Sequence, residues 1–193
     1  MKDAIIKAFD ESVRVKQAFL SDNLDQLTRV VEVIVAAFKG GNKLLLFGNG
    51  GSAADAQHIA AEFVNRYRIE RPPLPALALT TDSSALTAIG NDFGYSQIFA
   101  KQVRAIGRAG DVALAISTSG NSANVLAAVD VCRELNIATV GLTGGNGGRL
   151  VKMVDYFLCV AASSDTARIQ EVHILIDHVI CELVDDLLYR AKS

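Results

Sequence analysis

Five short apolar runs, separated by stretches of helical periodicity, constrain the fold more than any other feature of this sequence. The runs occupy residues 43–47, 75–80, 111–116, 137–143 and 155–160. Strands that are apolar on both faces and alternate with helices are typical of a parallel sheet covered on both sides. We therefore predict an α/β fold in three layers (αβα), with a five-stranded parallel sheet flanked by helices.

Before the first run, apolar residues recur at helical spacing over residues 3–20 and again over residues 24–38. Ser21 or Asp22 is suited to cap a second helix, and the glycines at 40–41 would end it. These signals predict two N-terminal helices that pack as a hairpin.

No low-complexity segment, flexible linker or internal repeat interrupts the chain, which we interpret as one domain over residues 1–193. Residues 1–40 would form its helical extension and residues 41–193 its α/β core. The core would end in a helix from about residue 166 to 189. This length is sufficient for one domain to bury a full hydrophobic core.

Composition excludes several classes of function. No apolar run approaches the ~18 residues of a membrane span, and the N-terminus lacks signal-peptide features, so we expect a cytoplasmic protein without a membrane partner. Nineteen basic and twenty-one acidic residues give a net charge of -2, without the basic block that marks a nucleic-acid partner. Cys132, Cys159 and Cys181 match neither a zinc motif nor a disulfide framework, and we interpret them as buried, reduced thiols.

Three predicted strand exits are rich in glycine or hydroxyl residues: FGNGGS, AISTSGNS and LTGGNGG. Ligands of parallel α/β sheets bind at such exits, where glycines let the backbone approach and helix N-termini offer N–H groups. The second exit adds four hydroxyls, those of Ser117, Thr118, Ser119 and Ser122. This density favours phosphate binding, whereas LTGGNGG is explained equally well as a structural turn.

Two other phosphate-binding motifs fit the sequence less well. The segment GNGGSA fits the relaxed dinucleotide fingerprint, with Asp82 placed as a ribose-binding acid. A nicotinamide site, however, has no evident use for a second hydroxyl-rich loop, nor for His58 and Glu62 on the following helix. The Walker motif is absent because no Gly-Lys-Ser/Thr follows a glycine loop.

His58 and Glu62 are four residues apart, so on a helix they share one face with about 6 Å of rise between them. Such a pair can hold a divalent ion, present a base beside an acid, or be an ordinary surface pair. The last predicted helix carries Gln170, His173 and His178. Gln170 and His178 are separated by about 12 Å and roughly 80°, so they meet only by reaching toward each other or by coming from different subunits. Spacing alone does not choose between the two histidines.

The pair FGNGGS and AISTSGNS resembles the sugar-isomerase (SIS) domain, whose serine-rich loops bind phosphosugars. GNGGSAADAQH, GNDFG at 90–94, GDVALAISTSGNSANV and ARIQEVH, in this order, resemble the phosphoheptose isomerase family over nearly the whole chain. The resemblance implies an aldose–ketose isomerase that converts sedoheptulose 7-phosphate to D-glycero-D-manno-heptose 7-phosphate through an enediol. That reaction is the first step of ADP- or GDP-heptose biosynthesis, which serves lipopolysaccharide and other glycans.

The resemblance also implies a metal site. In zinc-binding members of the family the ligands match His58, Glu62, Gln170 and His178, so one Zn²⁺ per subunit is expected. Imidazole, carboxylate and amide donors without a thiolate suit a catalytic zinc. The residues matching Glu62 and His178 are taken as the catalytic base and acid in that family. His173 falls outside this set, and we interpret it as structural.

A substrate site and an assembly follow from the same resemblance. The positions expected to contact substrate are Asn49, Gly50, Gly51, Ser52, Glu62, Asn91, Asp92, Ser117, Thr118, Ser119, Ser122 and Gln170. Asp92 has a competing role as a helix cap. Arg66 matches a family arginine, and a solvated surface charge explains it nearly as well. Members of the family form homotetramers with sites near subunit contacts, which is the assembly expected here.

The alternative function is a binding module. A related SIS-domain protein binds the bacterial replication initiator, and the segments RPPLPALALTTD and AKQVRAIG resemble it as much as they resemble the isomerase. In such relatives the positions of Glu62 and His178 no longer carry the acid and base, and because both are present here we favour the enzyme. A sugar-phosphate-sensing regulatory domain would keep the serine loop without needing these two residues.

Overall fold

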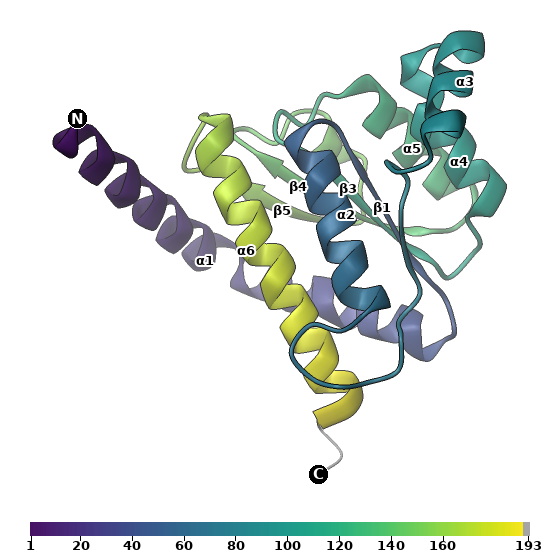
Figure 1. Ribbon diagram of the computed structural model, residues 1–193, viewed down its shortest axis with the longest axis horizontal. Helices are drawn as coiled ribbons and strands as arrows, with labels where there is room; N and C mark the ends of the chain where they lie inside the picture. Colours follow the sequence, from purple (N-terminus) through teal and green to yellow (C-terminus); the bar gives the residue numbers. More distant parts are fainter. Residues whose placement is uncertain (191–193) are drawn as a thin grey trace.

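A five-stranded parallel sheet forms the centre of the computed structural model, which describes residues 1–190 (Figure 1). Its strands lie in the order β2-β1-β3-β4-β5, with every neighbouring pair parallel. Along the chain they are β1 (Leu44–Gly48), β2 (Ala76–Ala78), β3 (Val112–Ser117), β4 (Ala138–Gly144) and β5 (Tyr156–Val160). The predicted parallel sheet is confirmed.

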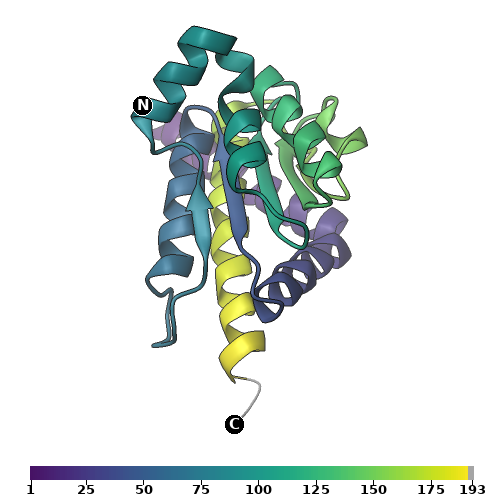
Figure 2. The same ribbon diagram turned by 90° about the vertical axis from the view of Figure 1, so that its right-hand side faces the viewer.

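Helices cover both faces of this sheet (Figures 1 and 2). They are α1 (Lys2–Lys39), α2 (Gly51–Val64), α3 (Ser83–Phe93), α4 (Ile98–Ile106), α5 (Ala123–Glu134) and α6 (Thr166–Asp185), which a π-helical turn (Asp186–Arg190) continues. Helices α1, α2 and α6 share one hydrophobic core with the sheet, and α4 and α5 share another. Helix α3 contacts α4. The three-layer arrangement is confirmed.

Alternate residues of each strand enter the two cores. In β1, Leu44 and Leu46 pack toward α1, α2 and α6, whereas Leu45 and Phe47 pack toward α4 and α5. All five residues of β1 are buried, and burying one large apolar side chain stabilises the fold by roughly 1.5–3 kcal/mol. A strand with two buried faces has no polar side, which is why these strands read as continuous apolar runs.

The direction of strand addition reverses between β1 and β3. From β1 the chain adds β2 on one side and then returns to add β3 on the other. The carboxyl ends of β1 and β3 are paired, with Gly48 opposite Ile116. At such a reversal the outgoing loops separate and leave a crevice, which is where open α/β sheets bind ligands. The FGNGGS and AISTSGNS loops leave the sheet at this point.

The N-terminal helical hairpin predicted from the sequence is wrong, because residues Lys2–Lys39 form one continuous helix. The polar stretch at 21–23 contains no glycine or proline that would break the helix. Asn23 is buried inside the helix, where its Nδ2 donates to the carbonyl of Phe19 at 3.0 Å and to that of Cys159 at 3.4 Å. The polar stretch that suggested a helix boundary thus contains a side chain that attaches α1 to β5.

The two halves of α1 lie in different surroundings. Its second half contributes Val30, Val31 and Ile34 to the core. Its first half extends beyond the rest of the molecule, at the N-terminal end labelled in Figure 1. This half exposes large apolar side chains, among them Phe9 with 71% of its surface accessible. The other large apolar residues exposed in this half are Ile5, Ile6, Val13 and Leu20.

The cysteines are free thiols: Cys132 and Cys181 are buried, as predicted, and Cys159 is only partly buried. Burial raises the pKa of Cys132 to about 12 and also raises the pKa of each of the other two thiols. Protonated thiols are poor nucleophiles, so these side chains act as small apolar residues. Over residues 1–190, none of the helices combines the length and hydropathy needed to cross a membrane.

Candidate active site

The glycine loop after β1 turns the chain directly into α2. Gly50 has φ +57° and ψ −122°, which side chains with a Cβ rarely adopt. The amide of Gln170 in α6 packs where a Cβ at Gly51 would lie, so a larger residue here would displace that side chain. Ser52 is buried in the first turn of α2. Asn49, Gly50, Gly51 and Ser52 therefore lie together at the carboxyl end of β1, where the sequence predicted a substrate site.

The serine loop, residues 117–122, leaves the adjacent strand β3. Ser117 Oγ and Ser122 Oγ are 3.0 Å apart, so the two ends of the loop are joined. Ser122 is the N-cap residue of α5, and its hydroxyl bonds to Ser117 instead of capping the helix. The first N–H groups of a helix have no partner within it and attract anions. Thr118 is partly exposed and Ser119 exposed, so the loop presents hydroxyls beside a helix N-terminus.

The glycine-rich loop after β4 supports the serine loop. The backbone N–H of Arg149 donates to Asn121 Oδ1 at 3.1 Å, and that of Leu150 donates to the carbonyl of Gly120 at 3.0 Å. A Cβ at Gly120 would collide with the carbonyl of Gly147. This close packing supports the interpretation of LTGGNGG as a structural turn. The two loops border a hollow of about 330 Å³, lined by Thr118, Ser119, Gly144, Gly145, Asn146, Ser164 and Ile169.

A pair of asparagines joins the glycine loop to α5. Asn49 Nδ2 donates to Asn124 Oδ1 at 2.9 Å, and Asn124 Nδ2 donates back to Asn49 Oδ1 at 2.8 Å. The hydroxyl of Tyr95 donates to the same Asn49 oxygen at 3.1 Å. Asn124 and Tyr95 were not predicted as site residues. Asn124 lies in the quoted serine-loop motif and Tyr95 follows GNDFG, but no sequence spacing pairs either of them with Asn49.

Asn91 and Asp92 lie exposed in the last turn of α3, where Asn91 Nδ2 donates to Asp92 Oδ1 at 2.8 Å. The helix-capping role considered for Asp92 is wrong, because the N-cap of α3 is Asp82, which accepts from the backbone N–H of Ala85 at 2.9 Å. This capping bond explains the presence of Asp82, which would bind a ribose if the chain had a dinucleotide site. Asn91 and Asp92 thus border the segment that Tyr95 ties to the glycine loop.

His58, Glu62 and His178 converge between α2 and α6. The Nε2 atoms of the two histidines are 2.9 Å apart, and His58 Nε2 lies 3.6 Å from Glu62 Oε1. One ring nitrogen of each imidazole and one carboxylate oxygen all lie within 4.8 Å of one another. All three side chains are at least partly exposed, so a ligand can reach them. Residues separated by 120 positions are brought into contact because α2 and α6 pack on the same face of the sheet.

The donor set of this cluster fits a catalytic zinc ion. Two imidazole nitrogens and one carboxylate, without a thiolate, are a known ligand set of catalytic zinc sites that keep a fourth position open. Two facing ring nitrogens can share one proton, or both can act as acceptors toward a cation. Gln170, the fourth predicted ligand, packs instead against Gly51. That position is seven residues before His58, a backbone rise of about 10 Å along α2.

Tyr67, in the loop after α2, packs on the ring of His178. The two ring centroids are 5.6 Å apart with an interplanar angle of 18°, and the guanidinium of Arg68 lies 5.1 Å from the Tyr67 centroid. The ring of His58 meets that of His178 edge-on at 5.1 Å. The His178 imidazole is therefore oriented by two rings. Sequence reasoning missed Tyr67, and Arg66 beside it is exposed.

His173 and Asp177 lie fully buried on the inner side of α6. Burial lowers the pKa of His173 to about 4, a shift that its bond to the Thr143 carbonyl opposes. The neutral imidazole donates from Nε2 to this carbonyl over 3.1 Å. Burial raises the pKa of Asp177 well above its usual range, and the nearby carboxyl of Asp55 adds to the shift. These surroundings support the structural role predicted for His173.

Comparison with known proteins gives consistent matches. The model of the SIS domain family matches residues 9–144. Phosphoheptose isomerases from Thermodesulfovibrio yellowstonii and Aneurinibacillus thermoaerophilus are 51% and 50% identical, over 100% of this chain and 96% and 98% of their own. The solved structure of a phosphoheptose isomerase from Neisseria gonorrhoeae superposes with a TM-score of 0.91 at 46% identity, covering 96% of this chain and 98% of that one.

Proposed function

Since the chain belongs to the phosphoheptose isomerase family of SIS-domain proteins and is a heptose-phosphate isomerase, we propose that it converts sedoheptulose 7-phosphate to D-glycero-D-manno-heptose 7-phosphate. The reaction would begin the biosynthesis of ADP- or GDP-heptose. Full-length similarity to curated isomerases supports an enzyme over the initiator-binding module.

One observation carries this proposal: His58 and Glu62, on the helix that starts at the glycine loop, converge with His178 of α6. Converting a ketose to an aldose removes a proton from the carbon beside a carbonyl and returns it to the neighbouring carbon. A second proton must move between the two oxygens. The reaction therefore needs two proton-transferring groups near one another, and this cluster supplies a carboxylate and two imidazoles.

Glu62 is the proposed base that moves the carbon-bound proton, and His178 is the proposed acid that moves the oxygen-bound proton. The Glu62 carboxylate can accept the proton from one carbon and return it to the same face of the neighbouring carbon. The His178 imidazole, oriented by Tyr67, can donate to the carbonyl oxygen as the enediol forms. Each group contributes on the order of 10²–10⁴ in rate in comparable enzymes.

The phosphate would be anchored by the serine loop, the N-terminus of α5 and the glycine loop. Ser52 lies in the first turn of α2, and His58 follows it by six residues, a rise of about 9 Å. This length suits a sugar chain with its phosphate at one end and its carbonyl at the other. Binding energy from the phosphate can then orient the reacting carbons. Asn91 and Asp92 are proposed to contact sugar hydroxyls.

His58, Glu62 and His178 would hold the proposed zinc ion, one per subunit. A zinc ion supplies polarisation of a carbonyl oxygen at such a site. Metal binding can be tested apart from turnover by titrating the metal-free protein with Zn²⁺ in a calorimeter. His58→Ala should lose binding, whereas His173→Leu should keep it. Equal affinity in the wild type and in His58→Ala would contradict this assignment.

We further propose a homotetramer in the cytoplasm, with each chain acting as one SIS-type domain. The apolar residues exposed on the first half of α1 support assembly, because apolar surface of this extent is unfavourable in a monomer. A groove of about 370 Å³ between α1 and α6, lined largely by leucine and valine, gives further support. The Gln170 amide lies against Gly51, a backbone rise of about 10 Å from His58, which is compatible with a site shared between subunits. A monomer mass by light scattering at assay concentration would contradict this assembly.

The deciding experiment is an NMR time course of the purified protein with sedoheptulose 7-phosphate in deuterated water. We expect an aldoheptose 7-phosphate to form, with deuterium incorporated at its C2, because an enediol intermediate exchanges that proton. Absence of conversion by folded protein, with and without added zinc, would refute the proposed reaction.

A further inference from the structure

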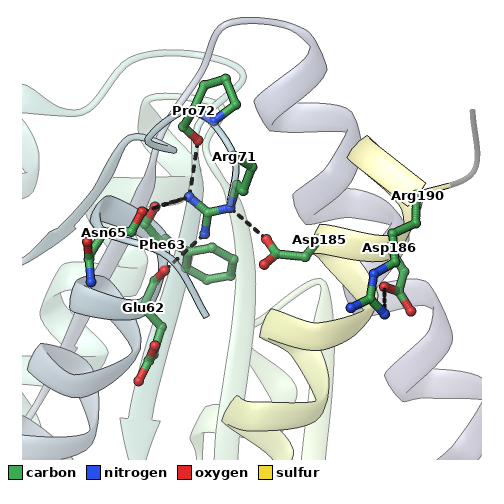
Figure 3. A network of polar contacts seen from close by, with 8 residues as sticks. All are labelled: Glu62, Phe63, Asn65, Arg71, Pro72, Asp185, Asp186 and Arg190. Atoms are coloured by element: carbon green, nitrogen blue, oxygen red, sulfur yellow. Dashed lines mark hydrogen bonds and ion pairs between the residues drawn. The ribbon is translucent and has the colours of Figure 1, made fainter. Parts of the chain in front are cut away.

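A buried arginine joins the end of α2 to α6 (Figure 3). Arg71 lies in the loop after α2, and only 1% of its side chain is exposed. Its Nε donates to Asp185 Oδ1 at 2.8 Å. Its Nη2 donates to the carbonyl of Glu62 at 2.9 Å and its Nη1 to that of Phe63 at 2.7 Å. Longer bonds from Nη1 reach the carbonyls of Pro72 at 3.1 Å and Asn65 at 3.4 Å.

The guanidinium supplies hydrogen bonds that α2 cannot make for itself. Helix α2 ends at Val64, so the carbonyls of Glu62 and Phe63 belong to its last turn, where carbonyls lack helical partners and the helix dipole is negative. A buried charge is costly unless it is paired and hydrogen-bonded. The planar guanidinium meets this requirement with one carboxylate and several carbonyls, which an ammonium group cannot match in geometry.

The same contacts connect the two proposed catalytic residues. One hydrogen bond holds the backbone carbonyl of Glu62. Another holds Asp185, which follows His178 by seven residues and so lies about two turns further along α6 on a similar side. One rigid group therefore links the backbone of the proposed base to the helix that carries the proposed acid.

We propose that Arg71 is a positioning residue of the isomerase, which holds the Glu62 carboxylate at the correct distance from the His178 imidazole. The inference rests on the catalytic roles proposed above for these two residues. Arg71 would act only through Glu62 and would not touch the substrate. Its loss should therefore lower turnover more than it weakens substrate binding.

The chain offers a matched control in the same two segments. Arg68, three residues before Arg71, pairs with Glu182 of α6, three residues before Asp185, at 2.6 Å. This outer pair is solvent-exposed, with 57% and 37% of the two side chains accessible. Its contacts go to the other member of the pair and to the Tyr67 ring, whereas the contacts of Arg71 include the backbone of α2. A comparison of the inner pair with the outer pair therefore distinguishes two effects. One is the positioning of Glu62, and the other is the general attachment of the loop to α6.

The experiment compares Asp185→Asn and Arg71→Lys with Glu182→Gln and the wild type. For each protein, kcat and KM are measured with sedoheptulose 7-phosphate, and the affinity for inorganic phosphate and the thermal unfolding temperature are measured separately. We expect both inner variants to lose about 10- to 100-fold in kcat, because displacing a catalytic group by ~1 Å costs up to ~10²-fold. Their KM and phosphate affinity should stay within about two-fold, since the phosphate loops lie at the other end of α2. Glu182→Gln should keep kcat within about two-fold.

A purely structural role predicts a different result: a lower unfolding temperature with unchanged kcat per folded molecule. That result for Asp185→Asn, or an equal loss of kcat in Glu182→Gln, would overturn the proposal. If Arg71→Lys does not fold, Asp185→Asn decides, because it removes the charge of the ion pair with Arg71 while keeping the volume of the side chain. An active wild type with unaffected inner variants refutes only this inference, whereas an inactive wild type also refutes the proposed function.

Discussion

The outer and inner sides of α6 carry the same type of residue in opposite environments. His178 faces α2 and the loop after it, where it meets His58 and Tyr67 and stays partly exposed. His173, five residues earlier and about 140° around the helix, is fully buried and bonds to a carbonyl of β4. The outer histidine can exchange protons with a ligand, whereas the inner one is held neutral by its surroundings. Burial and hydrogen-bond partners, more than residue type, decide whether a histidine is available for chemistry.

The largest expected effect is on the outer side. Glu62→Gln and His178→Asn should each lower kcat by about 10²–10⁴, because each removes a group proposed to transfer a proton. Phosphosugar binding should stay within a few-fold, and the unfolding temperature should change little, since both side chains are partly exposed. Steady-state kinetics and binding calorimetry measure the two effects separately. Full turnover by Glu62→Gln would show that another residue is the base.

A substitution on the inner side of α6 should lower the stability of the protein rather than its turnover. His173→Leu fills a similar volume but leaves the Thr143 carbonyl without its donor, which should lower the free energy of unfolding by about 1–3 kcal/mol. Folded His173→Leu should keep kcat within about two-fold. Denaturant unfolding and kinetics on the same preparation provide both values. If His173→Leu lost as much kcat as His178→Asn, the proposed difference between the inner and outer sides of α6 would be contradicted.

The pH dependence of stability further distinguishes the inner side of α6 from its outer side. His173 titrates near 4 in the folded protein and near 6.5 when unfolded, so the unfolded state binds more protons between these pKa values. The free energy of unfolding should therefore fall by up to about 3 kcal/mol as the pH is lowered through this window, at about 1.4 kcal/mol per pKa unit. Asp177, with its raised pKa, contributes with the opposite sign.

Subtracting the His173→Leu curve from the wild-type curve, both from unfolding at pH 7 and pH 4.5, isolates the contribution of His173. The variant should lose the part of the pH dependence that this histidine causes. Identical pH dependence in the two proteins would mean that the buried imidazole takes up its proton as easily as a free one.

A smaller effect is expected in the proposed phosphate site, away from both histidines. Ser122→Ala removes the hydroxyl that bonds to Ser117, and with it one proposed donor to the phosphate. KM should rise by about ten-fold with kcat nearly unchanged, because a hydrogen bond to a charged group contributes about 1.5 kcal/mol or more. The KM of Ser119→Ala, a substitution on the exposed part of the same loop, is compared with the KM of Ser122→Ala. An effect confined to kcat would contradict the anchoring role.

The smallest expected effect tests how His178 is oriented. Tyr67→Leu removes the ring stacked on its imidazole and should lower kcat about three- to five-fold, whereas Tyr67→Phe should retain full activity because the contact is ring to ring. Steady-state kinetics of the two variants make the comparison. Equal losses in both would indicate that the phenol hydroxyl matters instead.

The sheet and the two loops at its carboxyl edge could be predicted because their signals are local. Apolar runs mark strands buried on both faces, and glycines with hydroxyls mark strand exits that bind anions. The hairpin prediction failed because a cap-like serine and aspartate do not stop a helix when no breaker follows and tertiary contacts continue it. Asn23 provides such a contact with β5.

The cluster around His178 could be predicted only through resemblance to a family. Spacing within α6 does not reveal which side faces α2, and His58 lies 120 positions away. Tyr67, Arg71 and Asn124 escaped prediction for the same reason: each contributes through a partner that is distant in sequence or bound only through the backbone. Residues that orient other residues leave no local pattern to read.

The stacking of Tyr67 on His178 also gives the protein an intrinsic optical reporter. The chain contains four tyrosines and no tryptophan, so its ultraviolet fluorescence is tyrosine emission. The brightness of a phenol ring depends on the charge and hydrogen bonding of the group stacked against it. Occupation of the cluster by an ion or a sugar is therefore expected to change the emission of the unlabelled protein, which would let binding be followed in real time without a dye or a coupled reaction.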